Sequence, residues 1–480
     1  MLFTSLQFLL FLPAAAAVLF ALPAAYRNPY LLLVSYGFYA AWNPAYVLLL
    51  ALVTAISYGS GIAIERAASP AARKAWVSVS ALAILGALFV FKYFNLFAQS
   101  GQALLAAVGI HAEVPELRLL LPVGISFYTF QSLGYTVDVY RGARPAERDL
   151  LRYALFVSFF PQILSGPINR STQLLPQFVR APYFDSERIV AGMQLMAWGF
   201  FKKLVIADRL GVYVDQVYDD PTGVGGLPIF IATVLYAFQV YCDFSGYTDI
   251  AIGTAQVLGY EMMLNFRQPY LAASTQEFWR RWHISLSTWF RDYVYISLGG
   301  NRVSPVRRYV NLFIVFVLSG LWHGASWTFV IWGALHGLYL VIGTATRQVR
   351  ERWAQRNGLT RMPRLHYLLQ LLVTFVLVDF AWIFFRAATF DDAIYIITHM
   401  FRGWDLSAGV TLGLGTYEMT LVLMALAILL VVDWLQSRMP LRANIAELPV
   451  WARWSLYYGV VMCVLLLGKT GGGKFIYFQF

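Results

Sequence analysis

Charged side chains are scarce in this sequence. Asp, Glu, Lys and Arg make up 13% of the residues, whereas an average soluble protein contains about 25%. Hydrophobic residues make up 59% of the chain. A chain of this composition has too few charges to cover a water-exposed surface, so an ordinary soluble enzyme is excluded. The composition predicts a polytopic membrane protein.

Cysteine and the motifs of soluble catalysts are almost absent as well. Cys242 and Cys463 are the two cysteines, and both lie in apolar stretches without CxxC spacing. Neither a disulfide framework nor a metal site is therefore indicated. The sequence also contains no phosphate-binding glycine loop, GxSxG elbow or HExxH pair. Any chemistry must come from polar groups inside the apolar segments.

Acidic residues are fewer than basic ones, with 25 Asp and Glu against 36 Lys and Arg. In a soluble chain this excess would suggest nucleic acid as a partner. Here the basic residues gather in short loops between apolar segments, as the positive-inside rule describes. The clearest such loop, residues 347–364, holds six arginines and one glutamate. We therefore expect membrane lipids as partners, no nucleic acid, and a multi-pass membrane protein with both termini on the outer face.

The longest stretch without Lys, Arg, Asp or Glu runs from Tyr309 to Thr346. It is too long for one span, which takes about 20 residues, and Gly320, Gly324 and Ser326 interrupt it near the middle. We therefore predict two helical arms that meet at a turn, with His323 at that turn. An ionisable side chain deep in a membrane is costly and by default marks a functional site. A core histidine bonded to a backbone carbonyl is the alternative.

The returning arm carries a second histidine, His336. It follows His323 by thirteen residues, which along a straight helix corresponds to roughly 20 Å. We therefore expect His336 to be a structural or cytoplasmic-edge residue and too distant to act as a partner of His323.

A second apolar run, Leu227 to Leu264, is also too long for one span. Asp, Ser and Gly near its middle predict a break, because these residues favour caps and turns. Asp243 and Asp249 then either cap the broken helix or line a polar cavity, and the sequence leaves both interpretations open. The span before this run is expected to end near Lys202 and Lys203.

The segment from Ser274 to Gly300 has a different pattern, with large apolar residues along one helical face and charged residues along the other. It predicts an amphipathic helix in the membrane interface, with its aromatic side chains facing the acyl region. Ser274 and Glu277 form a capping box at its start. The residues of the apolar face are Phe278, Trp282, Leu286, Trp289 and Tyr293.

Arginines on the polar face of this segment are candidates for donor binding. Arg280, Arg281 and Arg291 either anchor the helix to anionic lipid or line the entrance for an anionic donor such as coenzyme A or phosphopantetheine. Helical periodicity does not separate these two roles. His283 lies at the border of the two faces, and its position alone favours an interfacial histidine over a catalyst.

Several motifs resemble one family of membrane enzymes. They extend over nearly the whole chain and are highly specific: LPVGISFYTFQ at 121–131, FPQ at 160–162 with Gly166-Pro167, YCDFSG at 241–246, EFWRRWHISLS at 277–287, GGNR at 299–302 and LWHGASW at 321–327. Together they resemble the membrane-bound O-acyltransferase family, and within it the bacterial alginate O-acetyltransferase branch.

The resemblance implies an all-α fold with about ten or more transmembrane or re-entrant helices around a central intramembrane catalytic cavity, in a single domain over residues 1–480. It implies that an acyl group, typically acetyl, passes from a cytoplasmic thioester to an exported alginate-like polysaccharide. Acetyl-CoA or an acyl-phosphopantetheine carrier would be the donor, with no bound cofactor. A periplasmic esterase-like protein would be the partner.

The same resemblance assigns the catalytic histidines. His323 matches the catalytic histidine of the family, and His283 matches its second signature position. The chemistry suits an imidazole, because a neutral ring can take the proton of an acceptor hydroxyl during acyl transfer. Burial in a low-dielectric interior favours this neutral form.

The C-terminal segment contributes a third candidate, Tyr477. Three glycines, 471–473, precede an aromatic hexapeptide that is too apolar to remain in water. This segment either anchors in the interface, as Tyr and Phe commonly do, or folds into the catalytic cavity and presents the Tyr477 hydroxyl as a nucleophile. Related surface-polymer acylation systems carry a similar C-terminal aromatic motif with a tyrosine, which favours the second interpretation.

Other functions remain open at this point. D-alanyl transfer and peptidoglycan O-acylation are close variants of the same chemistry. A transporter with an intramembrane His and Asp relay is a different class, although the sequence lacks the similar halves that many transporters show. A lipid-anchored scaffold for polymer export, without turnover of its own, is the third alternative.

Overall fold

The fold is described from a computed structural model, for residues 1–111, 114–164, 166–405, 413–469 and 475–476. Every regular element in these ranges is helical, and they contain no β-strand. The all-α prediction is therefore confirmed. Contacts divide the chain into two compact units: unit 1 is Met1–Leu195 with Ile250–Met263, and unit 2 is Met196–Asp249 with Leu264–Phe480. The expectation of a single domain over 1–480 stays a prediction.

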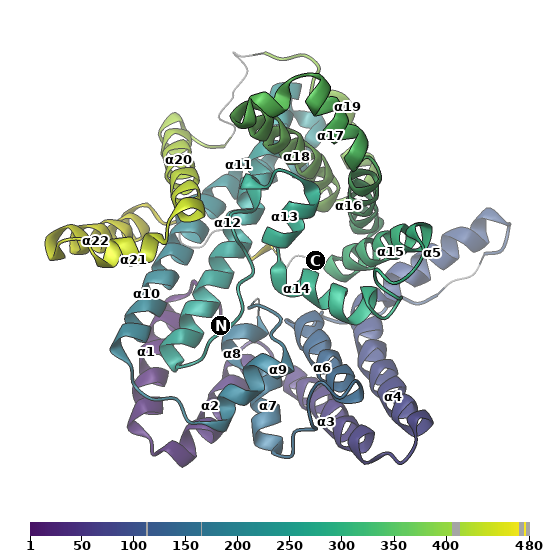
Figure 1. The fold of residues 1–480 in the computed structure, drawn as a ribbon, viewed down its shortest axis with the longest axis vertical. Coiled ribbons are helices and arrows are strands. Elements are labelled where there is room, and N and C mark those ends of the chain that lie inside the picture. The colour runs from purple at the N-terminus through teal and green to yellow at the C-terminus, as the bar shows by residue number, and fades with distance from the viewer. Residues whose placement is uncertain (112–113, 165, 406–412, 470–474, 477–480) are drawn as a thin grey trace. The chain divides into compact units, whose positions relative to one another are not determined.

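The helices of unit 1 are labelled in Figure 1. They are α1 (Leu6–Ala21), α2 (Ala24–Ala40), α3 (Ala45–Arg66), α4 (Pro70–Leu88), π-helical η1 (Phe89–Tyr93), α5 (Phe94–Ala107), α6 (Ile125–Tyr140), α7 (Leu150–Ser158), α8 (Phe160–Ile163), α9 (Ser171–Leu174), 3-10 η2 (Leu175–Val179) and most of α10 (Ser186–Phe200).

Unit 2 holds the remaining elements. They are π-helical η3 (Phe201–Ala207), α11 (Asp208–Asp219), η4 (Pro221–Gly223), most of α12 (Gly226–Leu258), η5 (Pro269–Leu271), α13 (Thr275–Arg281), α14 (Ile284–Trp289), π-helical η6 (Phe290–Tyr295), α15 (Pro305–His323), α16 (Trp327–Ala345), α17 (Arg347–Arg356), η7 (Leu359–Arg361), α18 (Pro363–Arg386), α19 (Phe390–His399), α20 (Thr416–Arg438), α21 (Leu441–Ala446) and α22 (Val450–Leu467).

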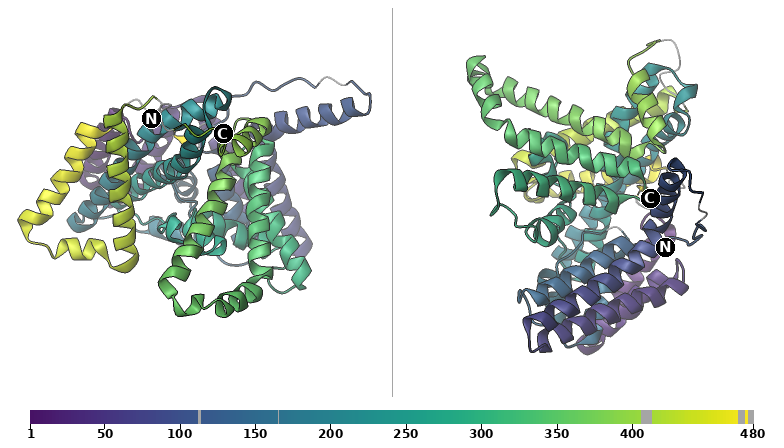
Figure 2. Two further views of the ribbon diagram at one scale, coloured as in Figure 1. Left: turned by 90° about the horizontal axis from the view of Figure 1, so that it is seen from above. Right: turned by 90° about the vertical axis from the view of Figure 1, so that its right-hand side faces the viewer.

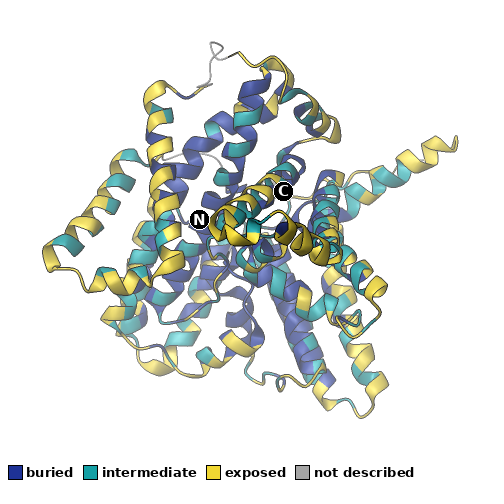
Figure 3. Cartoon of the chain, turned by 45° about the horizontal axis from the view of Figure 1, so that its top comes forward, coloured by how far each residue is buried: buried dark blue, intermediate teal, exposed yellow. Residues whose placement is uncertain are grey.

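Many of these helices expose large apolar side chains. Eight helical runs in the described part of the chain are long and apolar enough to cross a membrane, and two shorter apolar helices accompany them. On α22, Trp451, Leu465 and Leu466 are each at least 70% exposed. Figure 3 marks exposed residues in yellow and buried residues in dark blue; in α12, by contrast with α22, 78% of the spanning window is buried. Apolar surface of this extent needs a partner, so the chain is a multi-pass membrane protein, as predicted.

In unit 1, α3 packs against α4, α6 and α7. α3 and α6 are tightly packed at Gly61, where an added Cβ would lie 2.6 Å from the Tyr135 hydroxyl. Two of the sequence motifs meet in the same unit through buried amides. Gln162 donates to the Gln131 side-chain oxygen at 3.1 Å, and Asn169 donates to the Gln162 oxygen at 3.0 Å. The loop after α8 is thereby joined to α6 without any charged group.

In unit 2, α15 and α16 form the helical hairpin that the charge-free run predicted. The hairpin closes tightly because glycines face each other across it. A Cβ on Gly320 would collide with the carbonyl oxygen of Phe329, and one on Gly333 would collide with that of Phe316. Figure 2 shows α16 and α18 side by side, with the arginine-rich α17 lying across their ends.

The predicted break in the run from Leu227 to Leu264 is wrong. α12 continues as one helix of 33 residues from Gly226 to Leu258, so Asp243 and Asp249 lie inside it and cap nothing. The prediction that the preceding span ends near Lys202 and Lys203 is also wrong. These lysines lie buried in η3, within a helical run that continues to Asp219.

Candidate active site

His323 is the last residue of α15. The helix ends there because Gly324 is extended, with φ −151° and ψ 151°, and α16 begins after Ser326, which accepts a hydrogen bond from the Thr328 N–H at 3.3 Å. The turn places the imidazole inside the protein, where only 2% of His323 is exposed.

Aromatic rings surround the His323 imidazole. Its centroid lies 4.9 Å from Trp332 and 5.4 Å from Phe385, both edge to face. The ring of His283 lies 5.9 Å away. The structure thus brings together the two histidines that the sequence motifs single out, although they are forty positions apart in the chain.

His283 occupies an unusual backbone conformation. Its φ is +43°, in the left-handed region of backbone conformation that residues other than glycine rarely adopt. Asn265 holds the following residues in place, because its carbonyl accepts from the Ile284 N–H at 3.0 Å and its side-chain oxygen accepts from the Ser285 N–H at 3.2 Å. His283 is fully buried, with the ring of Phe244 4.7 Å from its own. Such strain held by neighbours is typical of functional sites.

The conformation of His283 also corrects the sequence prediction for this segment. The chain from Ser274 to Gly300 is not one amphipathic helix, since α13 ends at Arg281 and α14 begins at Ile284. Its large apolar side chains do not face lipid either: Phe278, Trp282, Leu286 and Trp289 are each at most 7% exposed. Periodicity identified the buried face correctly, but it could not show that protein covers that face.

Only part of the predicted capping box is present. The Ser274 hydroxyl accepts from the Glu277 N–H at 3.1 Å, as expected. The Glu277 carboxylate, however, accepts from the Ala273 N–H and not from that of Ser274.

His336 lies close to His323, so the expected separation of roughly 20 Å is wrong. Both imidazoles pack against the ring of Trp332, at 4.9 and 5.0 Å. The Trp279 indole N–H donates to the His336 Nδ1 at 3.2 Å, which assigns a structural bond to that nitrogen. The prediction failed because it measured along one straight helix, whereas the hairpin turns the chain back beside Trp332.

Buried charges on α12 form a second polar cluster in unit 2. The Lys203 Nζ lies 2.7 Å from both Asp208 and Asp243. The Lys202 Nζ lies 2.7 Å from Asp249. Of the two interpretations left open for Asp243 and Asp249, capping is wrong, because both aspartates pair with lysines from within α12; Asp243 is buried and Asp249 is half-buried. Sequence reasoning missed these lysines as site residues, although two adjacent lysines inside an apolar run are a signal of function.

The C-terminal segment comes back to this cluster. Phe475 is fully buried, its ring 4.1 Å from Tyr247 and 6.1 Å from Phe244. The Ile476 N–H donates to the Asp243 Oδ2 at 2.8 Å. Tyr477 lies outside the described residues, so its predicted role stays a prediction.

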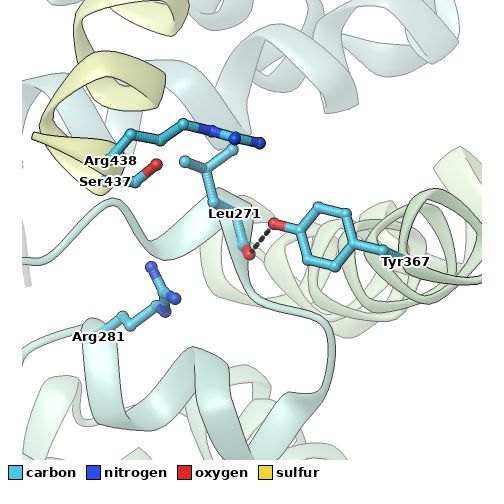
Figure 4. Close-up of a pocket in the computed structure, with 5 residues that line it drawn as sticks. All are labelled: Leu271, Arg281, Tyr367, Ser437 and Arg438. Carbon is cyan, nitrogen blue, oxygen red and sulfur yellow. Dashed lines mark hydrogen bonds between the residues drawn. The ribbon is translucent and has the colours of Figure 1, made fainter. Parts of the chain in front are cut away.

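The predicted role of Arg280, Arg281 and Arg291 in donor binding stays a prediction. Of the three, Arg281 lines a surface pocket with Leu271, Tyr367, Ser437 and Arg438, shown in Figure 4. Arg280 is exposed and does not line this pocket. Arg291 pairs with its neighbour Asp292 at 2.7 Å.

The pocket has a cavity volume of about 510 Å³, within the usual range of roughly 300–1,000 Å³ for ligand sites. Arg281 is paired with Glu277 at 2.6 Å, and the Tyr367 hydroxyl donates to the Leu271 carbonyl at 2.8 Å. Arg438 lies on the other wall of the pocket, at the end of α20. No group of three His, Cys, Asp or Glu side chains suited to a metal ion occurs in the part of the chain covered by the structure.

Comparison with known proteins decides the family. Residues 143–388, which include both His283 and His323, match the model of the membrane-bound O-acyltransferase family. The chain is also 41% identical over 413 residues to the probable alginate O-acetylase AlgI of Azotobacter vinelandii, covering 85% of this chain and 80% of that protein. The chain belongs to the membrane-bound O-acyltransferase family.

Two further relatives give the range of this similarity. The acyltransferase is 40% identical over 411 residues to the probable alginate O-acetylase AlgI of Pseudomonas aeruginosa, covering 85% of this chain and 76% of that protein. It is 36% identical over 428 residues to the peptidoglycan O-acetyltransferase of Helicobacter pylori, covering 83% and 79%. These relatives confirm the prediction of an alginate O-acetyltransferase-like O-acyltransferase over the alternatives of a transporter and a scaffold.

Proposed function

We propose that this acyltransferase moves an acyl group, typically acetyl, from a cytoplasmic thioester through the membrane for O-acylation of an exported, alginate-like polysaccharide. The observation that carries the proposal is the buried pair of imidazoles, with His283 and His323 5.9 Å apart. The alginate O-acetylase relatives support acetyl as the group and alginate as the type of acceptor.

In this proposal His323 is the general base. Its neutral ring takes the proton of an acceptor hydroxyl while the hydroxyl oxygen attacks the thioester carbonyl. A C–O bond forms, the C–S bond breaks, and the proton passes to the leaving sulfur, so that the donor departs as a thiol. His283 is the second catalytic histidine and contacts the same reacting group.

Tyr477 is the first acceptor in this scheme. The phenol has an ordinary pKa of about 10, so a base removes its proton more easily than that of a sugar hydroxyl. Support comes from the two residues of the same segment that are described. Phe475 is buried beside Phe244, which also contacts His283, and Ile476 is buried with its N–H bonded to Asp243. The acyl-tyrosine ester would then pass its group to a periplasmic esterase-like partner and on to the polymer.

The donor's phosphates would bind at Arg281 and Arg438. The two guanidinium groups line one pocket, and arginine is well suited to phosphate. Acetyl-CoA and an acyl-phosphopantetheine carrier both present such phosphates. Arg280 and Arg291 lie outside this pocket and remain candidates for contact with anionic lipid.

The orientation of the chain forms part of the proposal. We place the protein in the bacterial inner membrane, with the arginine-rich α17 and the Arg438 pocket on the cytoplasmic side and both termini on the outer side. The six arginines of residues 347–364 support this assignment through the positive-inside rule.

Peptidoglycan is the second candidate acceptor, favoured by the relative at 36% identity. D-alanyl transfer is a third, supported by weaker similarity: the teichoic acid D-alanyltransferase of Bacillus subtilis is 27% identical over 58% of this chain. Offering purified protein acetyl-CoA, acetyl-loaded carrier and D-alanyl-loaded carrier in turn would identify the donor.

The deciding experiment follows the acyl group itself. Protein in lipid nanodiscs is incubated with radiolabelled acetyl donor, and peptides are analysed by mass spectrometry for acetyl-tyrosine. We expect label at Tyr477 in the wild type, none in Tyr477→Phe, and unchanged label in Tyr458→Phe, which changes an exposed tyrosine. Label that persists in Tyr477→Phe and passes directly to polymer would remove the tyrosine step and leave His323 as the base for direct transfer.

A further inference from the structure

Phe475 and Ile476 are buried although the helix before them is not. They are 0% and 3% exposed, whereas none of the spanning window of α22 is buried. The ring of Phe475 lies against Tyr247 at 4.1 Å with an interplanar angle of 35°. The segment therefore occupies a defined seat on α12, formed by Asp243, Phe244 and Tyr247.

The Asp243 carboxylate is a polar part of the seat, and both of its oxygens are in use. The Asp243 Oδ1 lies 2.7 Å from the Lys203 Nζ, and its Oδ2 accepts the Ile476 N–H at 2.8 Å. Lys203 thus fixes the carboxylate so that one oxygen faces the segment. Because the bond is made to a backbone N–H, it recognises the main chain at position 476 and not the isoleucine side chain.

The neighbouring ion pair has no such role. Lys202 contacts Asp249 at 2.7 Å and donates to Ser245 at 2.9 Å, and neither bond involves the described residues 475 and 476. Two aspartates of α12 are thus paired with lysines of η3, and of these Asp243 accepts the Ile476 N–H. Replacement of Asp249 is therefore a matched control for replacement of Asp243.

The chain is also held before the glycines. The Arg209 side chain donates to the Leu467 carbonyl at 2.6 and 3.1 Å, and the Lys469 N–H donates to the Leu204 carbonyl at 3.0 Å. Residues on both sides of 470–474 are thus fixed to η3, α11 and α12.

We propose that Asp243 is a positioning residue that seats the C-terminal segment by its backbone, beside Phe244 and hence next to His283. Lys203 orients the carboxylate, and Tyr247 supplies the aromatic surface for Phe475. The seat itself is independent of the chemistry. Its importance for acyl transfer rests on the proposed function, in which the segment presents the first acceptor.

The seat is tested by release of the segment from the full-length protein in nanodiscs. Endoproteinase Lys-C cleaves after Lys474 when the segment leaves its seat, and the freed hexapeptide is counted by mass spectrometry. We expect Asp243→Leu to release it at least tenfold faster than the wild type, and Asp243→Asn, which keeps an acceptor oxygen, to fall in between. Asp249→Asn should release it at the wild-type rate.

A second pair of variants leaves α12 untouched. Ile476→Pro removes the N–H and should also release the hexapeptide at least tenfold faster, whereas Ile476→Val keeps the N–H and should not. Lys203 retains Asp208 as a partner when Asp243 is replaced, so the membrane core should still fold, as thermal unfolding will verify. Equal release from wild type, Asp243→Leu and Ile476→Pro would overturn the proposal, as would equal acceleration by Asp249→Asn.

The release experiment tests the seat separately from the chemistry that the Tyr477 labelling experiment tests. If the seat exists but the proposed chemistry is wrong, the release rates change as predicted while no variant carries acetyl label. If the chemistry is right but the seat is wrong, Tyr477 is labelled at the same rate in Asp243→Leu and in the wild type.

Discussion

The motifs of both units are joined by buried polar groups, but the groups that join them differ in kind. Unit 1 joins its motifs through neutral amides, with Gln131, Gln162 and Asn169 bonded to one another and to backbone carbonyls. Unit 2 buries ionisable groups, namely the Lys203 pair with Asp208 and Asp243, and the imidazoles of His283 and His323. Neutral amides cost little to bury once bonded, whereas buried ions lose several kcal/mol of hydration each.

This difference separates scaffold from chemistry. An amide network fixes loops without reacting, which is what a structural motif requires. Lysines, aspartates and histidines are costly to bury in a membrane protein, and there they mark functional sites. Substitutions in these motifs should therefore have different effects: changes in the amide network should lower stability, whereas changes at the histidines should lower acyl transfer.

The largest effect should come from the imidazole of unit 2. His323→Ala should lower polymer acylation by about 10²–10⁴-fold, the usual contribution of a general base, while the protein reaches the membrane in normal amount. O-acetyl content of the exported polymer, set against protein level in membranes, measures this. Substantial acylation by a normally expressed variant would remove His323 from the mechanism.

The second-largest effect should come from substitutions in the α15–α16 hairpin, which carries His323. Gly333→Ala adds a methyl group that collides with the Phe316 carbonyl, and overpacking of this kind costs about 1–3 kcal/mol. Both the melting temperature and the transfer rate should fall. Gly343→Ala lies on the same helix, where the nearest atom to an added Cβ is 3.9 Å away, and should change neither. Similar behaviour of the two variants would contradict this packing argument.

The amide network of unit 1 should affect stability alone. Gln162→Leu leaves the Gln131 side-chain oxygen without its donor, at a cost of about 1–3 kcal/mol. Thermal unfolding should show the loss, while the rate per folded molecule stays within about a factor of two. Gln173→Leu, at an exposed position, serves as the control. A large loss of rate without loss of stability would place chemistry in unit 1 and remove the contrast between the units.

The smallest effect should appear at the surface pocket. Arg438→Glu should raise the KM for the donor by up to about tenfold at low ionic strength, and the difference from wild type should shrink with salt because exposed charges are screened. Arg280→Glu and Arg291→Glu, outside the pocket, should change it less. A larger effect at Arg280 or Arg291 than at Arg438 would restore the donor entrance predicted from the sequence.

Sequence alone predicted the elements whose signal is local. The run from Tyr309 to Thr346 lacks charge and contains a glycine-rich turn, and this pattern was sufficient to predict the hairpin and the buried His323. The resemblance to a family supplied His283, which its place at the border of a face did not reveal. The polar residue Asp243, by contrast, led to the prediction of a helix break that does not exist. The helix continues through this position because Lys203, distant in sequence, pairs with the Asp243 carboxylate.

Contacts between distant segments account for the remaining errors. The sequence shows that Phe278 and Trp282 share a face, but not that protein rather than lipid covers it. It shows thirteen positions between His323 and His336, but not that both rings meet Trp332. It shows an aromatic C-terminal segment, but not the single backbone N–H that Asp243 accepts. Each of these facts depends on folding back of the chain, which spacing does not encode.

The π-helical segment η3 has a consequence for insertions and deletions. A π turn contains one more residue than the α-helical turn it replaces, and in η3 that widened turn precedes Arg209 and contains Lys203. Loss of one residue there would rotate the following helix by about 100° relative to the preceding one, which would turn the Arg209 side chain away from the Leu467 carbonyl. Many single substitutions in η3 would keep this geometry, whereas a change of length by one codon would not. Over this short stretch the number of residues is therefore under stronger constraint than the identity of most of them.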